Sequence, residues 1–264
     1  MLRSVISLIV LMLIAVASLS GEARPAQEQD ENDPASAKAL IDQAIKARGG
    51  AAYLAVQTII SQGQYTQFEK GISGLPRSFI DYIVYPDRER TEFGKGDDKF
   101  IQANSGGSGW VYDAPQKMIR DQTDEQIKSF QQGIRHDLEN LLRHSWQEPG
   151  AKLVYLGRRE AWKNTFSEAI RIDFADGNSV TLHFDTRTKL PLMIEYKSVS
   201  GDKTTNDQTR YFRWVDFGGI KFATIQDFYR EGQQTGRVNF DTVRFNEPVP
   251  EKLFVKPASI KEVK

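Results

Sequence analysis

Apolar residues recur along the chain with two different periods, and the change of period marks where helix gives way to strand. Between residues 34 and 48 the apolar positions follow a helical spacing. Asp33 stands at the N-cap position, Pro34 at the first helical position, and Gly49 and Gly50 follow the last apolar residue. The pattern predicts an N-terminal helix that these two glycines end.

From Thr58 onward the period shortens to about two, which is typical of strands with one buried face. Turn residues separate the alternating stretches, as Asp176 and Gly177 do between two of them. On residues 169–174 and 179–184 one face is apolar and the other is polar. The predicted strands cover residues 59–68, 77–85, 89–93, 99–103, 110–113, 152–156, 169–174, 179–184, 192–198, 211–217, 221–229 and 237–245.

A second helical pattern interrupts the strands. Thr123 and Gln126 match the capping box that opens many helices. Pro149 and Gly150 close the segment. Six apolar residues between them share one helical face, at steps of 3, 4, 4, 3 and 1: Ile127, Phe130, Ile134, Leu138, Leu141 and Leu142. We therefore expect a mainly β (α+β) fold, one large curled antiparallel sheet with an N-terminal helix and a long central amphipathic helix.

Residues 1–17 are typical of a secretory signal peptide. Arg3 supplies the positive charge, residues 5–14 form an apolar run, and Ala15 and Ala17 give the small-x-small pattern of a cleavage site. An uncleaved anchor is the alternative. A membrane-spanning helix needs roughly 20 apolar residues, whereas the apolar run here has only ten. We expect cleavage after Ala17 and, because an exported chain without cysteine suits a bacterial envelope, localisation in the periplasm of a Gram-negative-type cell.

The rest of the chain divides into three predicted parts. Residues 18–33 are polar and acidic and lack apolar periodicity, which predicts a disordered leader. Residues 34–258 carry all the predicted elements and form a single domain. Residues 259–264 form a short C-terminal tail.

Composition narrows the classes of function. The 264 residues include 35 Lys and Arg against 35 Asp and Glu, so the zero net charge gives no reason to expect nucleic acid as a partner. The absence of cysteine excludes disulfides, thiol catalysis and a lipid-modified N-terminal cysteine. The aromatic content, 15 Phe, 9 Tyr and 4 Trp, is typical of strands and of the walls of apolar cavities.

No catalytic motif is present in the sequence. It lacks the metalloprotease, nucleophile-elbow, phosphate-loop and EF-hand patterns. His136 and His144 are eight residues apart in the predicted helix, too far to share a metal ion, and His183 falls on the polar face of a strand. We therefore expect no enzymatic activity, no cofactor and no metal site.

Several phrases, taken in order, resemble the LolA/LolB-like superfamily of periplasmic lipoprotein carriers and its outer-membrane lipoprotein-sorting members. The phrases are residues 47–50, 85–90, 109–112, 185–191, 214–222 and 245–254, which together span about residues 35–257. The resemblance implies an unclosed barrel of about eleven strands with helices across its open mouth and an apolar interior. The missing N-terminal cysteine points to the soluble carrier branch rather than the membrane-anchored acceptors. No cargo-gating arginine of the family aligns with a residue of this chain.

The sequence thus predicts a monomeric carrier that binds acyl chains of lipoproteins or lipids, exchanging them between an inner-membrane donor and an outer-membrane acceptor. The cavity and its lid are expected to use Trp110, Tyr112, Ile127, Phe130, Ile134, Leu138 and Leu141. The alternative is a non-enzymatic envelope interaction or assembly protein with the same fold and a filled core. A hydrolase is a third possibility, for which the sequence shows no nucleophile–base pair.

Overall fold

The computed structural model describes residues 32–200 and 203–263. The predicted signal peptide and nearly all of the predicted leader lie outside these residues. The helices are α1 (Pro34–Arg48), α2 (Ala51–Leu54), α3 (Asp124–Arg135) and α4 (Leu138–Arg143). None of the helices in the described ranges is long and apolar enough to cross a membrane.

Seven strands precede α3 and seven follow α4. The first seven are β1 (Thr58–Glu69), β2 (Ile72–Ser73), β3 (Arg77–Val84), β4 (Arg88–Phe93), β5 (Phe100–Ser105), β6 (Ser108–Asp113) and β7 (Met118–Asp121). The second seven are β8 (Lys152–Trp162), β9 (Thr165–Asp173), β10 (Ser179–Asp185), β11 (Pro191–Ser200), β12 (Lys203–Phe217), β13 (Ile220–Arg230) and β14 (Gln233–Phe245).

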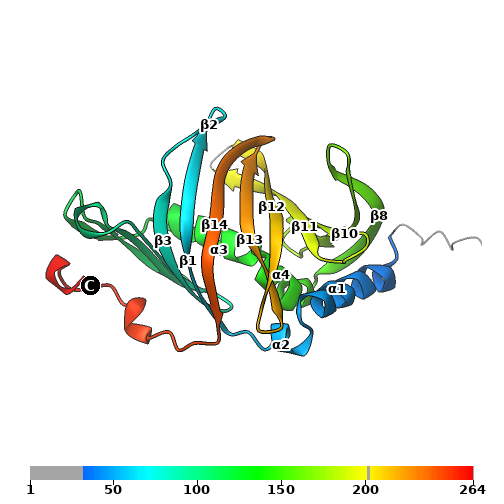
Figure 1. The fold of residues 1–264 in the computed structure, drawn as a ribbon, viewed down its shortest axis with the longest axis horizontal. Coiled ribbons are helices and arrows are strands. Elements are labelled where there is room, and N and C mark those ends of the chain that lie inside the picture. Colours follow the sequence, from blue (N-terminus) through cyan, green and yellow to red (C-terminus); the bar gives the residue numbers. More distant parts are fainter. Residues whose placement is uncertain (1–31, 201–202, 264) are drawn as a thin grey trace, which may run out of the picture.

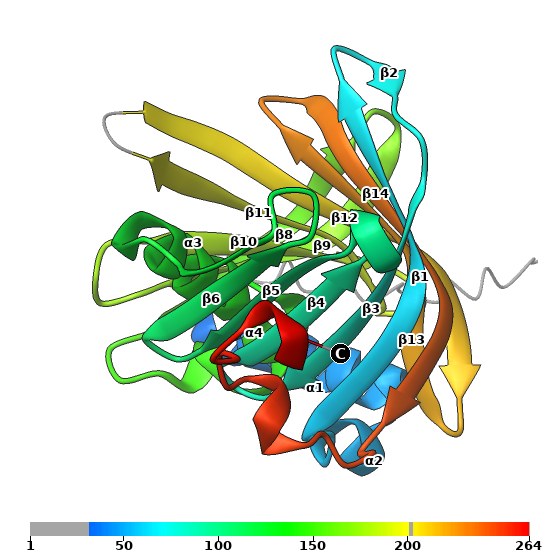
Figure 2. The same ribbon diagram turned by 90° about the vertical axis from the view of Figure 1, so that its left-hand side faces the viewer.

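All of these strands belong to one antiparallel sheet, in the order β7-β6-β5-β4-β3-β1-β14-β13-β12-β11-β10-β9-β8, with β2 paired only to β1. The first and last strands of this order do not pair, so the sheet curls without closing into a barrel (Figures 1 and 2). The predicted mainly β, unclosed and curled sheet is confirmed. It has 14 strands, against about eleven implied by the family resemblance and twelve predicted from the alternation, which the short β2 and β7 carry too little of to be recognised.

The N-terminal helix forms as predicted. The Asp33 carboxylate accepts hydrogen bonds from the backbone amides of Ala35 and Ser36, at 3.0 and 2.9 Å, and so caps α1. Gly49 ends the helix with a φ of +132°. A Cβ atom on Gly49 would lie 2.4 Å from the carbonyl oxygen of Gly219, so glycine also permits close contact between the helix end and the β12–β13 turn.

The prediction of one continuous central helix is wrong. Its capping box at Thr123 and Gln126 is present, but α3 ends at Arg135 and α4 begins at Leu138. Asp137 adopts an extended conformation and accepts a hydrogen bond from the backbone amide of Glu139 at 3.1 Å, so it caps a new helix instead of continuing the old one. The apolar positions predicted on one face are thus divided between two helices.

The main hydrophobic core lies between the concave face of the sheet and α1, α2 and α4. It includes the predicted dry face, whose side chains are all at most 5% exposed: Ile170, Ile172, Phe174, Val180, Leu182 and Phe184. His183 lies on the opposite face, as predicted, but is buried there because it contacts Ser167 and Glu195 on the neighbouring strands.

The C-terminal segment (residues 250–263) packs on the outer, convex face of β4, β5 and β6 (Figure 2). The indole Nε1 of Trp110 donates to the carbonyl oxygen of Phe254 at 2.8 Å, and the guanidinium of Arg90 donates to that of Leu253 at 2.7 Å. Val263, within the predicted tail, packs against the small buried cluster around Trp110. The segment thus covers strands distant from it in sequence.

Candidate binding cavity

A cavity of about 400 Å³ lies between the concave face of the sheet and the junction of α3 and α4. Its lining comes from β1, β3 and β4 on one side, from β11 to β14 on the other, and from residues 133–139. Five phenylalanines and four tyrosines contribute to the lining. The volume falls within the range of about 300–1,000 Å³ that is typical of small-molecule sites.

One end of the cavity is a wall of aromatic rings. Phe79 on β3 contacts Phe93 on β4, with ring centroids 6.3 Å apart, and Phe240 on β14 at 5.7 Å. Phe240 contacts Phe222 at 5.1 Å, and Tyr65 contacts Phe93 at 6.0 Å. Such edge-to-face and tilted contacts fix the rings in place and leave a continuous apolar surface toward the cavity.

The other end of the cavity is acidic. Asp81 on β3 lies opposite Thr91 on β4, and Glu89 lies opposite Ile83, so the two carboxyls are diagonal neighbours on the concave face. Asp137, at the junction of the two helices, faces them from above. The hydroxyl of Thr91 donates to Asp81 at 2.8 Å.

Burial changes the protonation of these carboxyls. It raises the pKa of Asp81 to about 7, and the charge of Asp137 adds to the effect. Burial likewise raises the pKa of Asp137 to about 6, with a contribution from Glu139. The pKa of Glu89 is raised well above its usual value by burial and then by Asp81 and Asp137. Near neutral pH the empty cavity therefore keeps Asp81 partly protonated and shifts Glu89 toward its protonated form, whereas Asp137 is mostly ionised.

His136 lies on the cavity wall beside this acidic end. Its ring is 2% exposed and contacts Tyr196, with centroids 4.5 Å apart. Neither ring nitrogen has a hydrogen-bond partner among the described residues. Burial, with the nearby charge of Arg135, lowers the pKa of His136 to about 4, so the imidazole is neutral at physiological pH.

Two buried guanidinium groups lie behind the acidic end. Arg48 is fully buried and forms an ion pair with Glu139 at 2.7 Å, and it donates to the hydroxyl of Tyr53 at 3.1 Å. Arg143 donates to the carbonyl oxygen of Val56 and lies over the ring of Tyr85. Four carboxyls therefore share two cationic side chains here, and the two on β3 and β4 form no ion pair with either of them.

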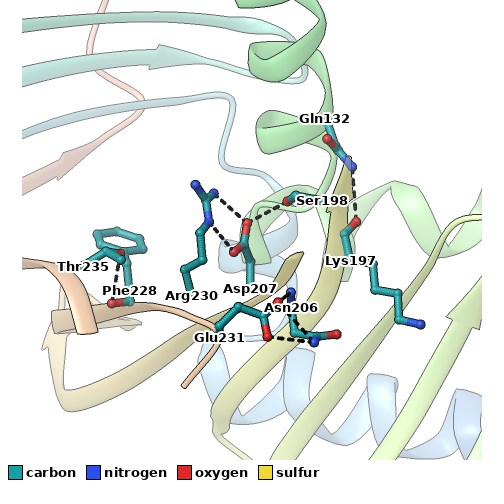
Figure 3. A network of polar contacts seen from close by, with 9 residues as sticks. All are labelled: Gln132, Lys197, Ser198, Asn206, Asp207, Phe228, Arg230, Glu231 and Thr235. Carbon is teal, nitrogen blue, oxygen red and sulfur yellow. Dashed lines mark hydrogen bonds and ion pairs between the residues drawn. The ribbon is translucent and has the colours of Figure 1, made fainter. Parts of the chain in front are cut away.

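The opposite rim of the concave face shows how an acid is stabilised when a cation is present (Figure 3). Asp207 accepts two hydrogen bonds from Arg230, at 2.8 and 2.9 Å, and one from Ser198 at 2.7 Å. Burial alone raises a carboxyl pKa, but these bonds hold the pKa of Asp207 below its usual value. Gln132 on α3 donates to the carbonyl oxygen of Lys197 at 3.3 Å and ties α3 to this rim (Figure 3).

Comparison with known proteins identifies the fold of the chain. No family model and no curated protein matches the chain. Among solved structures, a LolA superfamily protein from Nitrosomonas europaea matches with a TM-score of 0.55 and 12% identity, over 83% of this chain and 97% of that one. This chain has a LolA-like fold.

Two further solved structures share the LolA-like fold of the chain. A putative outer membrane lipoprotein-sorting protein domain from Vibrio parahaemolyticus has a TM-score of 0.53 and 11% identity, over 83% of this chain and 97% of that one. A DUF1329 family protein from Desulfovibrio piger has a TM-score of 0.59 and 16% identity, over 84% and 98%. These findings confirm the family resemblance at the level of fold.

The residues predicted to bind ligand lie in different parts of the LolA-like fold. Ile134 and Leu138 line the cavity. Phe130 lines a shallower hollow on the far side of Ile134, Ile127 is half-buried elsewhere on α3, and Leu141 is fully buried in the main core. Trp110 and Tyr112 lie on the convex face beneath the C-terminal segment. Their assignment to ligand binding stays a prediction.

The acidic end of the cavity was not predicted from the sequence. The signal was present on β3, where Asp81 alternates with Phe79 and Ile83 and so places a charge on an apolar face. Glu89 and Asp137 carry no comparable signal, because which face of β4 is concave and where the central helix breaks both depend on tertiary contacts.

A serine–histidine–glutamate row on the convex face bears on the hydrolase alternative. Ser167 Oγ lies 2.9 Å from His183 Nδ1, and His183 Nε2 lies 3.4 Å from Glu195. Ser167 is fully buried, and its hydroxyl donates to the carbonyl oxygen of Arg159 at 3.1 Å. A catalytic serine must reach substrate and give its proton to the histidine. This row therefore has the geometry of a structural hydrogen-bond chain.

Proposed function

We propose that the protein is a periplasmic carrier that binds acyl chains of lipoproteins or lipids, after removal of residues 1–17, and moves them towards the outer membrane. The observation that carries the proposal is the largely apolar cavity of about 400 Å³ between the concave face and the α3–α4 junction. The LolA-like fold supports it, since one solved structure with this fold is described as an outer membrane lipoprotein-sorting domain. The activity is non-enzymatic, with a membrane donor and a membrane acceptor as partners.

The physical need for such a carrier follows from the hydrophobic effect. Burying an alkyl chain gains about 0.8 kcal/mol per methylene, so a twelve-carbon chain gains roughly 10 kcal/mol before the costs of association. A free chain of this length therefore partitions into membranes instead of crossing an aqueous compartment. The aromatic wall of the cavity supplies the apolar surface that replaces the membrane during transfer.

In this proposal the helix α3 acts as the lid of the cavity. It crosses behind the central strands in Figure 1, and two exposed side chains tie it to the sheet. Gln131 donates to the carbonyl oxygen of Gly106 at 3.4 Å, and Gln132 donates to that of Lys197 at 3.3 Å. Each such bond contributes only about 1 kcal/mol, so opening of α3 must mainly overcome the ion pairs of Arg135 with Glu148 and Asp176 and the burial of Phe130.

The first test is native mass spectrometry of mature protein purified without detergent, followed by uptake of a fluorescent fatty acid. We expect bound lipid or acylated peptide in stoichiometric amount. A bare mass combined with no uptake contradicts the proposal and favours the envelope interaction protein.

Two isoleucines on α3 provide a matched pair of variants for the same uptake assay. Ile134→Asp places a charge on the cavity lining and is expected to weaken uptake at least tenfold, whereas Ile127→Asp places the same charge on the same helix away from the cavity. Leu138→Asp is expected to abolish retention as well, although Leu138 also packs in the main core, so its folding must be checked by circular dichroism. Equal uptake by both isoleucine variants contradicts the assignment of α3 as the lid.

A further inference from the structure

The acidic end of the cavity differs from every other buried acidic site on the described sheet. Asp227 accepts bonds of 2.5 and 2.6 Å from Arg237, and Asp207 accepts those from Arg230. Asp81 and Glu89 form no ion pair within the described residues, and the hydroxyl of Thr91 is the bonding partner of Asp81. The fold thus supplies arginines to its other buried strand carboxylates and none to the two that face the cavity.

His136 is an independent sign of a missing partner. A buried polar side chain normally forms a hydrogen bond, and one left without a partner costs about 1–3 kcal/mol. His136 is only 2% exposed and lies on the cavity lining. Neither of its ring nitrogens has a partner in the described part of the chain. A neutral imidazole offers one acceptor nitrogen, which a donor inside the cavity would satisfy.

We propose that the cargo carries a primary ammonium group at one end of its apolar chain, and that this group binds among Asp81, Glu89, Asp137 and His136 while the chain lies along Phe79 and Phe93. This inference rests on the proposed carrier function and names the class of its cargo. It reduces the charge imbalance, because one cation joins the two guanidiniums that four carboxyls now share.

The chemistry of the acceptors selects a primary ammonium group over other cations. Such a group has three N–H donors and no acceptor, which matches two carboxylates and one imidazole nitrogen. A trimethylammonium group has no donor and leaves these acceptors unsatisfied. The described residues contain no group of three side chains placed to hold a metal ion. A carboxylate or phosphate head group is repelled.

Binding is coupled to the release of protons. In the empty cavity burial shifts Asp81 and Glu89 toward the protonated form, and an ammonium group beside them favours the ionised form. The ammonium group enters with its three protons, the carboxyls lose theirs to solvent, and no covalent bond changes. The other titratable or charged groups that face this cluster are Tyr85, Tyr196, Tyr211, Glu139, Arg143 and, behind them, Arg48.

The test compares four probes that share a twelve-carbon chain: dodecylammonium, dodecyltrimethylammonium, dodecanol and dodecanoate. Their dissociation constants are measured at pH 6.5, below the raised pKa of Asp81, by calorimetry in two buffers of different ionisation enthalpy and below the micelle concentration of each probe. We expect dodecylammonium to bind at least tenfold more tightly than dodecanol and to release protons, and dodecanoate to bind more weakly than dodecanol.

Variants of the carboxyl residues test which side chains cause the preference for dodecylammonium. Glu89→Gln keeps the shape of the side chain but cannot ionise, so it should reduce the ratio of dodecylammonium affinity to dodecanol affinity at least fivefold. Asp81→Asn should act in the same way. The control Glu69→Gln, at the exposed end of β1, should leave both affinities as in the wild type.

The outcomes separate this inference from the carrier function. Equal binding of dodecanol and dodecylammonium overturns the inference and leaves the carrier function in place. Equal binding of the trimethylammonium probe also overturns it, because hydrogen bonding then plays no part. Binding of none of the four probes contradicts the carrier function, and with it this inference.

Discussion

Replacing Asp81 with asparagine tests whether the cavity holds its carboxyls protonated. Asp81 is 8% exposed, and burial raises its pKa from 3.8 to about 7. In the unfolded chain the same carboxyl titrates near its ordinary value. Between about pH 4 and pH 7 the folded protein therefore binds more protons than the unfolded one, and the free energy of unfolding falls as the pH rises through this window.

The size of the effect follows from the shift. About three pKa units at 1.36 kcal/mol each correspond to a loss on the order of 4 kcal/mol above pH 7, as an upper value. Glu89 and Asp137 titrate together with Asp81, so the loss belongs to the group. Asparagine has the same shape, accepts the hydrogen bond from Thr91 and cannot ionise. Asp81→Asn should therefore be about 2–4 kcal/mol more stable than the wild type at pH 8, and should differ from it little at pH 4.

The assay is urea unfolding of ligand-free mature protein from pH 4 to pH 8, followed by tryptophan fluorescence. The wild type should lose stability as the pH rises, and Asp81→Asn should lose less. Asp98→Asn, on an exposed turn, is the matched control and should follow the wild type. Equal pH dependence in the wild type and Asp81→Asn would refute the assignment of a raised pKa to this carboxyl.

Two further predictions concern the surroundings of the cavity. Trp110→Phe removes the indole donor to the carbonyl oxygen of Phe254, so proteolysis at Lys256 should become several-fold faster. Fatty-acid uptake should be unchanged. A loss of uptake in a folded variant would instead place Trp110 at the binding site. Arg48→Met leaves the buried Glu139 unpaired and should lower the free energy of unfolding in urea by about 3–5 kcal/mol. The double variant Arg48→Met/Glu139→Gln should recover part of this loss. An unchanged free energy of unfolding in the single variant would show that the ion pair is not buried.

Features determined by neighbouring residues could be predicted from the sequence. The Asp33 cap, the Gly49 end of α1 and the capping box at Thr123 each depend on contacts within about four residues. The dry face of β9 and β10 followed from alternation alone, because both strands bury that face completely. These features were sufficient for the mainly β fold with an unclosed sheet.

Features determined by distant contacts could not be predicted. Residues 110 and 112 share one face of β6, and nothing in their spacing shows that the C-terminal segment covers that face. The break before α4 depends on Asn140, whose amide donates to the carbonyl oxygens of Pro86 and Ile134 at 2.8 and 2.7 Å. An acidic residue such as Asp137 fits the polar side of a continuous helix equally well, so its position alone does not predict a cap there.

The same break explains why the acidic end of the cavity exists. A continuous helix would place position 137 on its polar face, whereas the extended conformation of Asp137 directs its carboxyl toward the two on β3 and β4. Holding three carboxyls together costs folding free energy that the guanidiniums of Arg48 and Arg143 offset only in part. Elsewhere on the same sheet this fold pairs Asp207 and Asp227 with arginines from adjacent strands, so a neutralising residue was structurally accessible. A ligand that enters with a positive charge recovers the cost each time it binds, and a built-in arginine would fill the space that such a ligand needs.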